Sequence, residues 1–262
     1  MPFQPPRTHR NLADPITAFQ VLGERNSGTN FLTQLVLANV TDIERRTKFG
    51  WKHGFVDRRT AATPGFLTLV IYRHPLRWLQ SVHLRPLELS SAVKSLDFSE
   101  FLRHEWQGAF HRDDGTEDPS TADMVPHTHD RNYPNPIALR NAKIRWLEEM
   151  ATMPGQIAYC RYEDVNRNPR AMLEALSQAF DLRLGPYRVI ERYKGRGDRR
   201  YLPKRLPQVA PADIAFIDAE LDHPQEAGIG YRLADVPWFD GLPAWDRRAL
   251  RARLTGIRSR RP

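Results

Sequence analysis

Three apolar runs stand out along the chain, and polar or turn-forming residues bound each of them. They cover 17–23, 66–72 and 156–162. Short apolar runs of this length, rich in β-branched and aromatic residues, are typical of buried strands. We therefore predict a strand in each run, and a further short strand near 48–53.

Helix-like spacing of apolar residues follows most of these strands. The predicted helices are 29–40, 75–83, 98–106, 136–152, 168–180 and 211–222. Strands that alternate with helices indicate a parallel sheet with helices packed on both faces. The sequence therefore predicts an α/β fold of three layers, with a central parallel sheet flanked by helices.

The length and composition favour a single domain. The chain has 262 residues and is 40% hydrophobic, which is enough to bury a full core, so we assign 1–262 to one domain. The segment 111–135 contains six acidic residues and three prolines. We expect it to be a long loop, acting as a lid on the substrate side. The segment 245–262 is a basic tail, which fits either a solvated helical face or a dock for an anionic acceptor.

The net charge and the lack of long apolar runs limit the classes of binding partner that we expect. Lys and Arg number 39 against 31 Asp and Glu, a formal net charge of +8. This excess attracts polyanions without singling out nucleic acid, so none is expected as a partner. No run of 18 apolar residues is present, and we expect no integral membrane segment and a cytoplasmic location. The one cysteine, Cys160, is expected to be a buried thiol.

A glycine-bearing turn, 23–28, joins the first predicted strand to the first helix. Such a turn directs backbone N–H groups and the positive end of the helix dipole to one spot, which is an anion site. Its expected guest is a phosphate or a sulfate ester. The stretch lacks the Lys of a Walker A loop, so a nucleoside triphosphate is disfavoured.

A second motif follows the strand 66–72. Arg73 stands at the strand end, Pro75 fits the first turn of a helix, and Ser81 follows about two turns later. Together with the loop at 23–28, this order resembles the sulfotransferases that use 3′-phosphoadenosine 5′-phosphosulfate (PAPS). In that family a Ser-Gly-Thr loop holds the 5′-phosphosulfate, and an Arg with a later Ser holds the 3′-phosphate.

The resemblance extends to two further blocks. The run 51–54 lies where the family carries a Lys-Thr-His, and 159–165 is similar to its Tyr-Glu-Asp-Leu strand. The resemblance implies the family's P-loop NTPase-like sulfotransferase fold, PAPS as the cofactor with adenosine 3′,5′-bisphosphate (PAP) as its product, and no metal. It implies that His53 is the general base, with Lys52 and Arg25 as catalytic cations.

The resemblance also implies a set of cofactor contacts, in which Phe31 and Tyr162 cover the two faces of the adenine. The set is Arg25, Asn26, Ser27, Gly28, Thr29, Asn30, Phe31, Arg73, Ser81, Tyr162, Lys194 and Arg196. The chain departs from the family at Asn26, where a Lys is usual, and at Lys52, which is shifted by one residue. The predicted function is transfer of a sulfuryl group from PAPS to a hydroxyl of a glycan or small-molecule acceptor.

Plainer roles remain open for several of these residues. Ser27 and Thr29 are also suited to capping a helix. His53 also fits a satisfied buried histidine, and Arg73 fits an ion pair with Glu163.

Two other functions also remain open. One is a P-loop nucleotide or small-molecule kinase, and the other is a catalytically inactive anion-binding or glycan-binding member of the fold. Three histidines, His111, His127 and His129, lie in the long loop, but they lack the further partners of a structural zinc site.

Overall fold

A computed structural model describes residues 3–57, 63–111, 116–119, 133–191, 206 and 209–235. A five-stranded sheet lies at its centre, in the order β1-β7-β4-β2-β3. The strands are β1 (Arg7–Arg10), β2 (Ala18–Leu22), β3 (Glu44–Arg45), β4 (Phe66–Tyr72) and β7 (Gln156–Arg161). The three apolar runs therefore form the three central strands, and these are parallel to one another.

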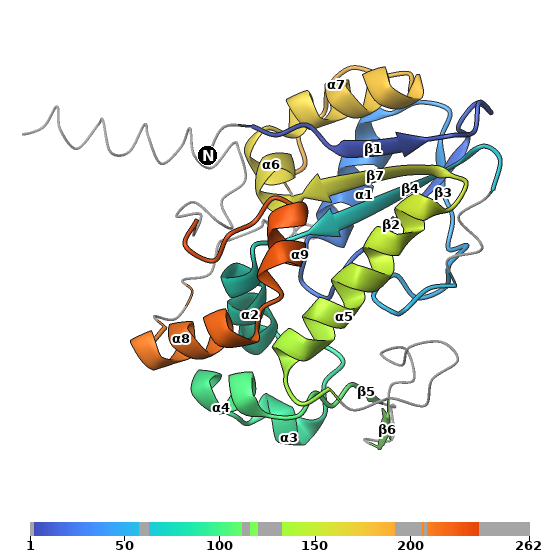
Figure 1. The fold of residues 1–262 in the computed structure, drawn as a ribbon. Coiled ribbons are helices and arrows are strands. Elements are labelled where there is room, and N and C mark those ends of the chain that lie inside the picture. The colour runs from blue at the N-terminus through green and yellow to red at the C-terminus, as the bar shows by residue number, and fades with distance from the viewer. Residues whose placement is uncertain are drawn as a thin grey trace, which may run out of the picture.

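Alternate residues of the central strands supply two separate cores. In β4, Leu67 and Leu69 belong to a cluster that includes residues of α1 (Thr29–Asn39) and α7 (Pro169–Phe180). Phe66 and Val70, which point the other way, belong to a cluster shared with α5 (Pro136–Glu148). Figure 1 shows α5 in front of the sheet and α1 behind it. Every residue of these strands is buried because helices cover both faces of the sheet.

A third core lies beyond the carboxyl ends of the strands. It joins the shorter helices to the first turns of α5. These helices are α2 (Pro75–Leu84), α3 (Ser91–Lys94), α4 (Phe98–Arg103) and α8 (Pro211–Glu220). The remaining helices are α6 (Tyr162–Arg167), α9 (His223–Gly228) and the 3-10 helix Glu149–Thr152. Within the described part of the chain, no helix combines the length and apolar character needed to cross a membrane.

The prediction of an all-parallel sheet was wrong at one edge. β1 pairs antiparallel with β7, so the sheet is mixed. β1 carries no apolar run because its residues are largely exposed; Arg7 binds Glu148, and Arg10 binds Asp181. An edge strand needs hydrogen-bonding groups on one side only, and it can be polar.

The predicted strand near 48–53 was also wrong. The residues there form turns. The edge strand next to β2 is the two-residue β3, which comes earlier in the chain. The buried amide of Gln20 fixes these turns: it donates to the carbonyl of Gly50 and accepts from the N–H of Phe49. This side chain satisfies backbone groups that a strand would have paired with a neighbour.

Several helix boundaries differ from those predicted. The helix expected at 98–106 ends at Arg103, and the one expected at 136–152 ends in a 3-10 turn after residue 148. The helix expected at 211–222 is two helices, because Asp222 caps a new one that begins with Pro224 in its first turn. The long loop 111–135 starts in a small hairpin, β5 (Ala109–His111) with β6 (Glu117–Pro119). The rest of that loop before Tyr133, and the tail 245–262, lie outside the described residues.

Candidate active site

The loop between β2 and α1 takes a backbone path that needs glycine at two positions. Gly23 has φ 155°, and a Cβ there would lie 2.4 Å from the carbonyl oxygen of Ile71. Gly28 has φ 103°, and a Cβ there would lie 2.4 Å from the ring of Tyr162. Contacts this short exclude a side chain, so the loop packs directly against β4 and the start of α6.

The amino end of α1 presents backbone N–H groups that no side chain caps among the described residues. Its N-cap is Gly28, and its first turn carries no acidic residue. Ser27 does not act as a cap, because its hydroxyl donates to the carbonyl of Glu24 at 2.7 Å. Thr29 is the first residue of the helix rather than its N-cap. An uncapped helix terminus next to a glycine-bearing loop is suited to binding an anion.

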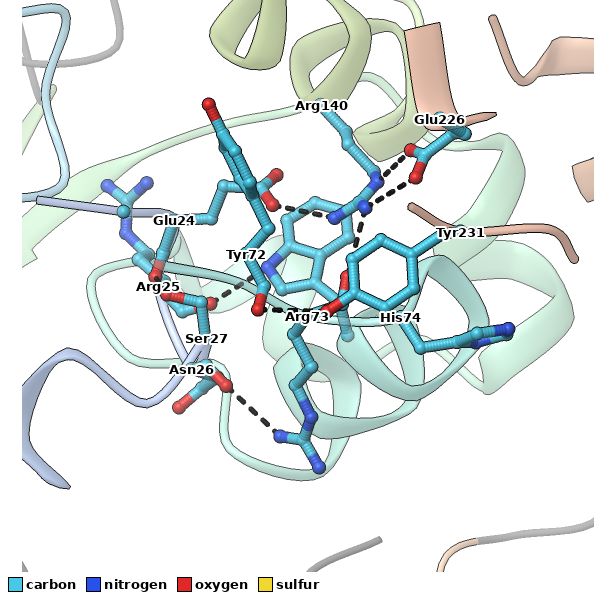
Figure 2. Close-up of polar contacts among 12 residues, drawn as sticks. Glu24, Arg25, Asn26, Ser27, Tyr72, Arg73, His74, Arg140, Glu226 and Tyr231 are labelled. Atoms are coloured by element: carbon cyan, nitrogen blue, oxygen red, sulfur yellow. Dashed lines mark hydrogen bonds and ion pairs between the residues drawn. The ribbon is translucent and has the colours of Figure 1, made fainter. Parts of the chain in front are cut away.

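Arg73 reaches this loop from the end of β4. Its Nη1 donates to the carbonyl of Asn26 at 3.0 Å, as Figure 2 shows. Its guanidinium also lies over the ring of Tyr162, 4.8 Å from the ring centre. The carboxylate of Glu163, the alternative partner considered for Arg73, accepts from the N–H of His74 and from the hydroxyl of Tyr231.

Asn26 connects the loop to α2. It has φ 60°, a left-handed conformation that Asn tolerates better than most residues. Its side-chain amide donates to the carbonyls of Ser81 and Arg85, at 3.3 and 3.0 Å. The structure therefore brings Asn26, Arg73 and Ser81 together.

Lys52 and His53 contact opposite ends of the loop region from a turn. The Nζ of Lys52 donates to the side-chain oxygen of Asn30 at 2.6 Å. The Nδ1 of His53 lies 2.7 Å from the carbonyl of Gly23. Because no strand persists here, the one-residue shift of the Lys does not turn it away from the site.

The hydrogen bond of His53 fixes its tautomer. A carbonyl oxygen only accepts, so Nδ1 carries the proton and Nε2 keeps the lone pair of the neutral ring. Burial is the main cause that lowers the pKa of His53 to about 3; the bond to Gly23 opposes it, and Lys52, Arg25 and Lys143 lower it further. The ring is therefore neutral at pH 7 and has one nitrogen able to take a proton.

The Arg25 guanidinium lies between aromatic rings. It is 4.6 Å from the ring centre of Trp51 and 5.4 Å from that of Trp106, and its Nε pairs with Glu88 at 3.3 Å. Its backbone carbonyl accepts from the indole of Trp78. Arg25 is thus held beside Trp51, whose ring contacts that of His53 edge to face.

The two aromatic residues assigned to the adenine belong to the same apolar core. Tyr162 is buried in the cluster formed with α1 and α7, and Phe31 packs against that cluster. Their role towards a base stays a prediction. Lys194 and Arg196 lie outside the described residues.

One cation beside His53 was not found from the sequence. Lys143 of α5 is buried, and its Nζ donates to the carbonyl of His53 at 2.5 Å and lies 5.9 Å from the ring centre of Trp51. A signal was present, because Lys143 and Arg140 fall on the side of the helix that also carries Ile144 and Leu147. A charged residue in an apolar stripe indicates a buried polar contact.

The site combines an uncapped helix terminus, several cations and a neutral histidine. No group of three His, Cys, Asp or Glu side chains that could hold a metal ion occurs among the described residues. Comparisons of the chain with protein-family models, with curated proteins and with solved structures found no match.

Proposed function

We propose that this protein is a PAPS-dependent sulfotransferase that acts on a hydroxyl of a glycan or small-molecule acceptor. One observation carries the proposal: His53 is hydrogen-bonded to Gly23, the first residue of the loop 23–28 between β2 and α1, which we call the anion loop. A proton acceptor is thereby held next to the place where a phosphosulfate would bind. The order of motifs along the chain, from this loop to Arg73 and Ser81, supports the same cofactor.

The chemistry requires few groups, and the site has a residue for each. Nε2 of His53 takes the proton of the acceptor hydroxyl, whose oxygen forms a bond to sulfur while the bond from sulfur to the bridging phosphate oxygen breaks. The products are the sulfated acceptor and PAP. Lys52 and the N–H groups of α1 stabilise the charge on the leaving phosphate, as in phosphoryl transfer. The cofactor's negative charge also opposes the cations around His53 and raises its pKa, which makes it a stronger base.

The cofactor assignment is tested by thermal stability with PAP. At 100 times its dissociation constant, PAP should stabilise the fold by about 2.7 kcal/mol. Arg73→Ala should lose most of that gain and remain folded without ligand, because it removes one of the two phosphate contacts. PAP affinity equal to wild type in Arg73→Ala would overturn the role of Arg73 in binding the 3′-phosphate.

The reaction is tested with labelled PAPS and a panel of hydroxyl acceptors. Transfer of the label to an acceptor supports the proposal. Stabilisation by ATP with Mg²⁺ but not by PAP would favour a kinase instead. Binding of PAP without turnover on any acceptor would favour an inactive anion-binding protein, a reading consistent with Asn26 at the position where the family carries a Lys.

A further inference from the structure

A buried polar cluster lies behind the loop and is distinct from the proposed ligand contacts. At its centre is Arg140 of α5, whose side chain is 0% exposed. Its Nη1 donates to Glu24 at 2.6 Å, and its Nη2 donates to the carbonyl of Arg73 at 3.0 Å. Its Nε and Nη2 also donate to the carboxylate of Glu226 in α9, at 2.5 and 2.9 Å. Figure 2 shows the guanidinium between the two carboxylates.

Two of the partners of Arg140, Glu24 and the carbonyl of Arg73, belong to the candidate site itself. Glu24 follows Gly23 in the loop, and its own carbonyl accepts from the N–H and the hydroxyl of Ser27. The carbonyl of Arg73 belongs to the residue whose side chain contacts the loop at Asn26. Arg140 therefore contacts the backbone of Arg73 and the side chain of a loop residue with one rigid group.

The directional hydrogen bonds of the guanidinium explain an Arg at position 140 better than any gain in stability does. Burial is the main cause that raises the pKa of Glu24 to about 7; Arg140 lowers it, Glu226 raises it, and Lys143 lowers it. Well-packed apolar residues often replace a buried ion cluster without loss of stability. A planar fork, however, meets three partners in fixed directions, which neither an apolar side chain nor a Lys can do.

We infer that Arg140 is a positioning residue that sets the spacing between the anion loop and Arg73, so that one ligand with two phosphate groups binds to both at once. The inference rests on the proposed function, because PAP is the ligand with that pair of groups. It assigns no contact with the ligand to Arg140. Arg140 acts through Glu24 and through the backbone of Arg73.

The test compares the affinities for PAP and for adenosine 5′-monophosphate (AMP), measured by calorimetry well below the melting temperature of each variant. The ratio of the two dissociation constants measures what the second phosphate adds. We expect wild type to prefer PAP by about tenfold or more, because the second contact is made within an already bound ligand. In Arg140→Lys this ratio should fall to about 2 while AMP affinity stays within about threefold of wild type.

Two further variants serve as an alternative to Arg140→Lys and as a control. Glu226→Gln preserves the shape of the cluster and weakens the hold on Arg140, so it should lower the ratio in the same direction if Arg140→Lys does not fold. Arg103→Lys is the control, because Arg103 joins α4 to Asp213 of α8, on other elements. It should leave the ratio unchanged.

The outcomes separate this inference from the proposed function. A high wild-type ratio that persists in Arg140→Lys and Glu226→Gln would overturn the positioning role alone. Equal losses of PAP and AMP affinity would also overturn it, since a loosened structure weakens both ligands alike. A wild-type ratio of one would overturn the two-phosphate site itself, and the inference with it.

Discussion

The orientation of the His53 ring decides which nitrogen can take part in proton transfer. Its Nδ1 is committed to the carbonyl of Gly23, so Nε2 is the only ring nitrogen that can accept a proton. The neutral form persists across the physiological range because the pKa of His53 is about 3. In the proposed reaction, the ring needs no prior deprotonation.

His53→Ala should lower turnover on an alcohol acceptor by ~10²-fold or more, because the general base is lost. PAP affinity should stay near wild type, since the base acts on the acceptor. The loss should be smaller for nitrophenol acceptors, which lose their proton far more easily than an alcohol does. Initial rates with both acceptors measure the difference, and near-normal rates of His53→Ala on an alcohol would place the base elsewhere.

Arg25→Ala should reduce turnover more than it weakens PAP binding, if Arg25 replaces the family's loop Lys. The reason is that charge on the bridging oxygen develops only in the transition state. Lys52→Ala is the comparison, and Arg25→Lys tests whether positive charge alone restores the rate. Equal losses of binding and turnover in Arg25→Ala would make Arg25 a ground-state contact only. Single-turnover rates and PAP titrations give the two quantities.

Residues that contact the loop were partly predictable. Motifs named Asn26 in the loop and four residues that contact the loop or the first turn of α1. These four are Arg73, Ser81, Lys52 and His53. Their spacing in the chain carried that information. Other contacts depend on which distant segments face the site, and a single sequence does not reveal it. The missed residues are Arg140 and Glu88, which contact loop residues, Lys143, which contacts His53, and Glu226, which contacts Arg140.

At the scale of elements, the loop before α1 packs closely against the start of α6. Gly28→Ala should destabilise the fold more than Gly50→Ala. Both positions have positive φ, which costs Ala about 1–2 kcal/mol. A Cβ at Gly28 also meets Tyr162 and adds overpacking of about 1–3 kcal/mol, whereas nothing lies within 4 Å of one at Gly50.

Urea unfolding of the two glycine variants measures this difference. Gly28→Ala should also weaken PAP binding, because the loop must move away from α6 to relieve the contact. Gly50→Ala should not affect PAP binding. Equal stability losses in the two variants would show that the approach of Tyr162 is not tight.

The elements that the sequence predicted best are those that depend on burial alone. β2, β4 and β7 are buried along their whole length, so their apolar runs identify them. β1 was missed because its pairing with β7 rests on backbone hydrogen bonds that a polar sequence makes equally well. The strand near 48–53 was predicted wrongly for the opposite reason. Phe49 is buried, but it lies in a turn and not in a strand.

At the scale of the whole molecule, buried titratable groups set how stability depends on pH. The pKa values of His53 and His74 fall from 6.5 to about 3, mainly through burial. Unfolding exposes both rings, so between pH 3 and 6.5 the unfolded chain binds more protons and stability is lost as the pH falls. Glu24 acts in the opposite sense, because its pKa rises from 4.5 to about 7 on folding. Between these pH values the folded chain binds more protons at Glu24, so this contribution to stability is lost as the pH rises.

The histidine effect is best measured at His74, because His53 is the proposed general base. His74→Gln should flatten the rise of stability between pH 4.5 and 6.5 by up to about 1.4 kcal/mol per pH unit, the effect of one proton. Glutamine keeps a donor for the carbonyl of Arg232, which the His74 ring contacts. Chemical denaturation at several pH values gives the slopes. A variant with the wild-type slope would mean that His74 is not held neutral.

The cluster around Arg140 also determines when the site can form during synthesis. Glu24, Arg140 and Glu226 leave the ribosome in that order, and all three central strands precede the last of them. At about 5–20 residues per second, roughly 10–40 s separate the first residue from the third. During that interval the sheet can assemble, but Arg140 lacks its partner in α9. The central sheet can therefore form before the arrangement that would bind a bisphosphate in the proposed function.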